Sequence, residues 1–129
     1  MGFIDRFRQA QEEGIHADWN VLEQAGQLQA IAEQSFEKPQ VLFKHSTRCG
    51  ISSMAKHQLE HDWNFDRDDF DMYYLDLIAH RDVSNQIADQ FGITHQSPQL
   101  IIVHQGKAVY DTSHHAISAT RLRTALDSL

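Results

Sequence analysis

Hydrophobic and polar residues recur along the chain in blocks that predict a mixed α/β fold. Apolar residues fall at helical spacing over 21–32, which predicts a helix, with Asn20 and Glu23 as its capping pair. Pro39 breaks this helical pattern. The short apolar run that follows predicts a strand over 41–45.

Three more helices and three more strands are expected downstream. The helices are predicted over 49–62, from Asp82 to Gly92 and from Ser118 onward, and the strands over 72–78, 100–103 and 108–110. A helix joins the first two strands, so these strands should be parallel. The last two strands form a hairpin through a tight link containing Gly106. The pattern predicts a mixed sheet of about four strands with helices on both faces.

Length and charge restrict the possible functions. The 129 residues fit a single domain over 1–129, with a polar extension at 1–18 in which Phe3, Ile4 and Phe7 indicate a short helix. A net charge of −7 disfavours a nucleic-acid or membrane partner. No signal peptide and no apolar run of ~20 residues is present, so we expect a cytoplasmic protein.

Cys49 is the only cysteine and lies where the predicted strand gives way to a helix. The positive field of a helix N-terminus favours the thiolate, which is the reactive form. Arg48 adds positive charge, and Ser52 stands where a Cys-x-x-Cys motif has its second cysteine. We therefore expect Cys49, Ser52 and Arg48 to form a catalytic site that makes only intermolecular disulfides. The alternative is an inert, buried cysteine.

The order of elements, with Cys49 after the first core strand and Pro98 before the hairpin, resembles the thioredoxin fold over residues 19–129. The block from Lys44 to Ser52 (KHSTRCGIS) resembles the signature of the bacillithiol-system monothiol redox family, the monothiol bacilliredoxins. In that family proline commonly follows the cysteine, whereas this chain has Gly50. The sequence Cys-Gly-Ile-Ser is thereby also similar to the Cys-Gly-Phe-Ser motif of monothiol glutaredoxins.

The resemblance implies removal of a low-molecular-weight thiol from client proteins by Cys49. The expected partners are thiolated client proteins and a small thiol, bacillithiol-like or glutathione, which serves as co-substrate in place of a resident cofactor. One rival is a glutaredoxin-like carrier in which Cys49 and bound glutathione ligate an iron–sulfur cluster. Another rival is a non-catalytic adaptor or stress protein of thioredoxin fold.

Several other residues are candidates for binding the small thiol. Thr47 either touches the ligand or caps the helix, and Lys44 either pairs with a ligand carboxylate or is solvated. In thioredoxin-like folds, the segment corresponding to Gln96, Ser97 and Pro98 offers backbone groups to the bound thiol. We expect the Ser97–Pro98 bond to be cis and to pack beside the cysteine. Gly50 completes the expected binding residues.

A His-x-x-Glu-His pattern at residues 57–61 matches a zinc-peptidase motif. The chain is small and offers no evident third ligand, so we predict no metal site there.

Overall fold

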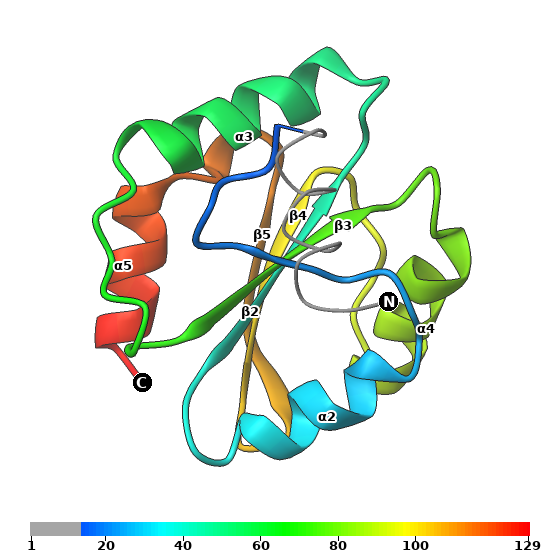
Figure 1. The fold of residues 1–129 in the computed structure, drawn as a ribbon, viewed down its shortest axis with the longest axis vertical. Helices are drawn as coiled ribbons and strands as arrows, with labels where there is room; N and C mark the ends of the chain where they lie inside the picture. The colour runs from blue at the N-terminus through cyan, green and yellow to red at the C-terminus, as the bar shows by residue number, and fades with distance from the viewer. Residues whose placement is uncertain (1–13) are drawn as a thin grey trace.

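The computed structural model describes residues 14–129, which form one mixed β-sheet with helices on both faces (Figure 1). The strands and helices follow one another along the chain as β1 (Asn20–Val21), α2 (Gln27–Gln34), β2 (Gln40–His45), α3 (Gly50–His61), β3 (Asp71–Asp76), α4 (Arg81–Phe91), β4 (Gln99–His104), β5 (Lys107–Ser113), the 3-10 turn η1 (His114–Ala116) and α5 (Ala119–Asp127).

The strand order in the sheet is β1-β3-β2-β4-β5. β2 and β3 are parallel and joined through α3, and β4 pairs antiparallel with both β2 and β5. These pairings confirm the predicted mixed α/β sheet of thioredoxin type. The sheet has five strands instead of about four, because the two residues of β1 pair with β3 at its edge.

Alternate residues of β2 point into two separate cores. Val41 and Phe43 pack with α3 and α5 on one face, whereas Leu42 packs with α2 and α4 on the other. All six residues of β2 are buried. Both faces of the central strand are therefore covered, as parallel sheets require.

The first helix differs from its prediction. α2 begins at Gln27 instead of residue 21, and Val21 pairs with β3. The side chain of Gln27 accepts hydrogen bonds from the backbone N–H groups of Glu23 and Gln24, which holds the preceding segment in a turn. The predicted capping role of Asn20 is wrong, because its side-chain amide donates to a carbonyl of β3.

Other helix boundaries follow the sequence signals. Gly92 ends α4 in the left-handed conformation with φ 65°, and the Ser118 hydroxyl caps α5 by accepting from the N–H of Arg121. Asp82 lies in the first turn of α4 but does not cap it, because His80 occupies the cap position.

The predicted helix around Phe3 and Phe7 lies outside the described residues. Within the described part, Ile15 and Trp19 are buried in the core on the α3 side. The segment from residue 15 onward therefore belongs to the packed domain. No helix within 14–129 is long and apolar enough to span a bilayer.

Candidate active site around Cys49

Cys49 occupies the cap position of α3, directly after the loop that follows β2. Its N–H donates to the carbonyl of Ser46 at 3.3 Å, and its own carbonyl accepts from the N–H of Ser53 at 3.1 Å. The backbone at Cys49 is extended, and the side chain is partly exposed. The thiol is thus held at the start of a helix and is accessible to another molecule.

The first turn of α3 lowers the pKa of the Cys49 thiol below its ordinary value. The main causes are the backbone N–H groups of Ser52 and Ile51, and the Ser52 hydroxyl adds a smaller effect in the same direction. These groups act as hydrogen-bond donors that favour the thiolate, whereas partial burial of the sulfur acts in the opposite direction. The charge of Arg48 is not among the causes.

Ser52 is completely buried beneath this turn. Its hydroxyl oxygen accepts a hydrogen bond from the N–H of Ser46 at 3.3 Å. Ser52 thereby joins the loop that carries Cys49 to the helix that lowers the thiol pKa. Arg48 is exposed, and its N–H donates to the Ser46 hydroxyl at 3.4 Å. A catalytic role for the Arg48 side chain stays a prediction.

We expect the alkylation rate of Cys49 to rise with pH at a midpoint below that of an ordinary thiol. The first turn of α3 causes the lowered pKa, and a free peptide spanning residues 44–52 is too short to form this helix. The peptide should therefore show the alkylation midpoint of an ordinary thiol, although it retains Arg48. The rate constant for iodoacetamide, followed from pH 5 to 10 by intact mass, measures both midpoints. Equal midpoints in protein and peptide would contradict the helix assignment.

Lys44 is completely buried, so the alternative of a solvated lysine is wrong. Its ammonium nitrogen lies 2.7 Å from Nδ1 of His95, in the segment that leads to Pro98. Burial lowers the pKa of Lys44 to about 8. The structure therefore encloses this side chain on the α4 side of the sheet and does not present it at the surface around Cys49.

Lys44→Met is expected to stabilise the protein at pH 7. The lowered pKa means that the charged form costs about 3 kcal/mol in the native state, whereas the lost hydrogen bond to His95 contributes about 1 kcal/mol. The expected gain in the free energy of unfolding is about 2 kcal/mol, measured by urea denaturation.

The sign of this effect can be checked against pH. Because the pKa of Lys44 is lower in the native state than in the unfolded chain, the wild-type protein loses stability as the pH falls from 10.5 towards 8. The stability advantage of Lys44→Met should therefore shrink when the pH is raised to about 10. Lys107→Met, at an exposed position of β5, is the matched control and should change stability little. A variant destabilised equally at both pH values would refute the argument.

The Ser97–Pro98 peptide bond is cis, as the resemblance to the thioredoxin fold predicted. Packing of this bond beside the cysteine stays a prediction. Gln99, the next residue, pairs with Lys44 on β2, so the cis bond and the loop carrying Cys49 lie at the same edge of the sheet. Binding of a small thiol by Gln96, Ser97 and Pro98 stays a prediction.

Sequence reasoning missed Gln99, which shapes this segment. The side chain is completely buried, and its amide nitrogen donates to the carbonyl of Thr94 at 3.1 Å. Its carboxamide oxygen accepts from the N–H of Gln96 at 3.3 Å. The signal in the sequence was a polar residue that directly follows Pro98 at the start of an apolar strand.

The family model for monothiol bacilliredoxin BrxC matches residues 20–122. This chain belongs to the monothiol bacilliredoxin family. The match contains all the strands, the complete α3 and the lone cysteine, so the identification rests on the same elements that build the site. The protein is thus a thiol–disulfide oxidoreductase of thioredoxin fold.

Solved structures share the thioredoxin fold with this bacilliredoxin. One, provisionally described as an oxidoreductase with a thioredoxin fold, is 31% identical, covers 81% of this chain and 90% of its own, and has a TM-score of 0.70. Thioredoxin from Malassezia sympodialis is 20% identical over 84% of this chain and 87% of its own, with a TM-score of 0.63. Thioredoxin from Fasciola hepatica is 18% identical over 84% and 96%, with the same TM-score. The two thioredoxins support the fold alone.

Gly50 stands at the position after the cysteine, where the resemblance to the family led us to expect proline. It is the first residue of α3, and a Cβ atom added there would meet no other atom within 4 Å. No close packing requires glycine at this position.

The predicted capping role of Thr47 is wrong, because Cys49 holds the cap position and the Thr47 side chain is exposed.

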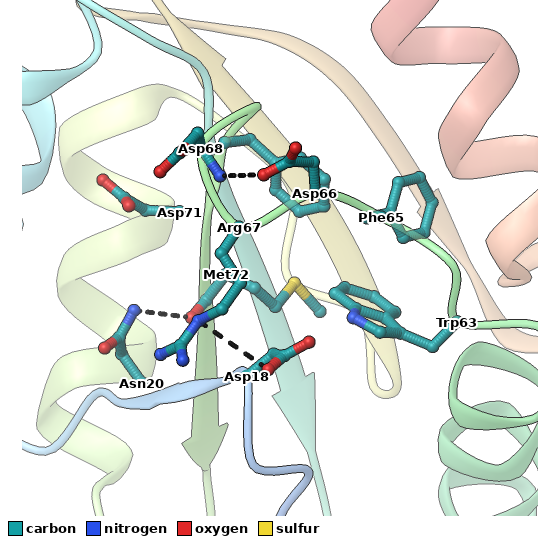
Figure 2. A pocket seen from close by; sticks show the side chains of 10 residues that line it. Asp18, Asn20, Trp63, Phe65, Asp66, Arg67, Asp68, Asp71 and Met72 are labelled. Carbon is teal, nitrogen blue, oxygen red and sulfur yellow. Dashed lines mark hydrogen bonds and ion pairs between the residues drawn. The ribbon is translucent and has the colours of Figure 1, made fainter.

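A cavity of about 250 Å³, separate from the region around Cys49, lies between β3 and the acidic loop that precedes it (Figure 2). Arg67 pairs there with Asp18 at 3.7 Å, and Asn20 donates to the Met72 carbonyl. No residue of the loop that carries Cys49 or of α3 lines this cavity, so we assign it no part in the thiol chemistry. Within residues 14–129 no group of three or more His, Cys, Asp or Glu side chains is placed to hold a metal ion.

Proposed function

We propose that this bacilliredoxin removes a low-molecular-weight thiol of the bacillithiol type from mixed disulfides on client proteins. The observation that carries the proposal is a single accessible thiol whose pKa is lowered by the first turn of α3. Ser52 stands in place of a second cysteine, so Cys49 has no internal partner with which to form a disulfide. Intermolecular exchange is the chemistry left to such a thiol.

The exchange proceeds in two balanced steps. The Cys49 thiolate attacks the sulfur of the small thiol in the client mixed disulfide, a new S–S bond forms, and the old bond breaks. The client cysteine leaves as a thiolate and is restored. A second thiol then attacks the small-thiol sulfur on Cys49 and leaves with it as a disulfide, which regenerates the Cys49 thiolate.

The first turn of α3 assists both steps. It raises the fraction of Cys49 present as thiolate before the attack, and it makes Cys49 a good leaving group when the second thiol arrives. The small thiol is a co-substrate in this scheme, and the chemistry needs no resident cofactor. A reducing compartment such as the cytoplasm suits this cycle, because a free thiol persists there.

The identity of the small thiol is tested by offering two disulfides in parallel. Reduced protein is incubated with oxidised bacillithiol or oxidised glutathione, and the adduct at Cys49 is followed by intact mass. We expect both adducts to form, with the bacillithiol adduct forming faster. A faster glutathione adduct, or visible absorbance of a cluster after anaerobic purification, would favour the glutaredoxin-like alternative instead.

A further inference from the structure

A cavity of about 270 Å³ lies beside the loop that carries Cys49. Its walls come from the end of β2, the loop after it, α3 and β3, and the side chains that line it all carry a polar group: His45, Thr47, Ser53, Lys56, His57, Glu60 and Tyr74. Ser53 connects this cavity to the thiol, because its N–H donates to the carbonyl of Cys49 at 3.1 Å. A group attached to the Cys49 sulfur therefore starts within one helical turn of the cavity wall.

His45 brings an unused hydrogen-bonding atom to this cavity. The side chain is only 4% exposed, and its Nδ1 lies 2.9 Å from the hydroxyl of Tyr74. The other ring nitrogen, Nε2, is buried and has no hydrogen-bond partner among residues 14–129. Buried polar atoms are normally paired, so an unpaired one on a residue that lines a cavity is a candidate contact for a ligand group.

The lysine and the carboxylate among the described lining residues are paired with each other. Lys56 lies 2.8 Å from the Glu60 carboxylate and 2.8 Å from the carbonyl of Gly14. Burial, helped by the charge of Lys56, lowers the pKa of His45 to about 4, so the ring is neutral at pH 7. Within residues 14–129, the cavity thus offers donors and acceptors with no unpaired lysine, arginine or carboxylate in its lining.

Such a lining favours a neutral hydroxyl over a charged group. A hydroxyl both donates and accepts, so it pairs with Nε2 in either tautomer of the neutral ring. A carboxylate only accepts and an ammonium only donates, and each would enter the cavity without a free counter-charge.

We propose that this cavity binds an uncharged, hydroxylated part of the small thiol that becomes disulfide-linked to Cys49, with His45 Nε2 bonded to one of its hydroxyl groups. The inference rests on the proposed function, since it concerns the ligand of the same thiol. It assigns His45 as a ligand-binding residue, and Tyr74 as the group that orients its ring.

A competition between four simple thiols tests this assignment. The protein is equilibrated with an equimolar mixture of 1-thioglucose, propanethiol, 3-mercaptopropionate and cysteamine and their disulfides, and the Cys49 adducts are counted by intact mass. A free peptide spanning residues 44–52 is treated in the same way and supplies the ratios expected without a cavity. We expect the protein to favour the thioglucose adduct about fivefold relative to the peptide.

His45→Leu should return the adduct ratios to those of the peptide, whereas His104→Leu, at the opposite end of a neighbouring strand, should leave the preference intact. The ¹⁵N shift of His45 Nε2 in the wild-type adducts is a readout independent of any variant. It should move in the thioglucose adduct and not in the propanethiol adduct.

Each other outcome overturns a defined part of the argument. Adducts at the peptide ratios, an unchanged Nε2 shift, or a preference for the anion or the cation would refute the cavity assignment and leave the thiol chemistry standing. Failure of Cys49 to form any of the four adducts would refute the proposed function itself.

Discussion

Cys49→Ala is expected to reduce removal of a small thiol from a client mixed disulfide to the rate seen without protein. No other residue of the chain forms a disulfide, so nothing replaces the lost nucleophile. The loss is measured with a thiolated model protein whose freed cysteine is counted by mass against time. Activity retained by the variant would contradict the proposed mechanism.

The same variant is expected to remain folded. Cys49 is partly exposed and makes no cap hydrogen bond of standard geometry, so its truncation should change the free energy of unfolding by less than about 0.5 kcal/mol. Gln58→Ala, at an exposed position on the same helix, is the matched control and should retain full activity. Far-UV circular dichroism and urea denaturation of all three proteins separate lost chemistry from lost structure.

Much of the fold was predictable because its signals are local. The apolar run of β2, the helical spacing after Cys49 and the hairpin through Gly106 each depend on residues close together in the sequence. The boundary between β2 and α3 placed the cysteine at a helix start, and the structure confirms this position. The thioredoxin-like order of elements followed from these local assignments.

The errors came from contacts between distant or unexpected partners. β1 exists only because Asn20 and Val21 pair with β3, more than fifty residues away, and their own sequence looks helical. The start of α2 depends on the side chain of Gln27, which bonds back to the preceding turn. Helical periodicity alone predicts neither the pairing of β1 with β3 nor the start of α2 at Gln27.

Lys44 and His45 show the same limit within the site. Neighbouring residues of a strand point to opposite faces of the sheet, but the strand pattern does not show that both faces are covered. Their partners, His95 and Tyr74, lie 51 and 29 residues further along the chain. A buried lysine and a buried neutral histidine are therefore results of packing that a single sequence does not reveal.

Acid is expected to destabilise this protein through His45. Burial and the nearby Lys56 lower the pKa of His45 from 6.5 to about 4, although the carboxylates of Asp76 and Glu60 act in the opposite direction. Between these two pH values the unfolded chain binds a proton at His45 that the native state does not bind. Stability contributed by the neutral ring is therefore complete above about pH 6.5 and is lost as the pH falls towards 4.

The lowering of the pKa from 6.5 to about 4 corresponds to about 3 kcal/mol of unfolding free energy. Urea denaturation at pH 7 and at pH 4 should show this loss in the wild type, beyond the loss found in His45→Phe. His104→Phe, at the opposite end of the neighbouring strand β4, keeps His45 and is the matched control, so it should retain the wild-type dependence on pH. If His45→Phe loses as much stability between pH 7 and pH 4 as the wild type, the buried ring is not the group that titrates. The pKa of His45 would then be the same in the native state as in the unfolded chain, and burial of the ring would not be the cause of acid destabilisation.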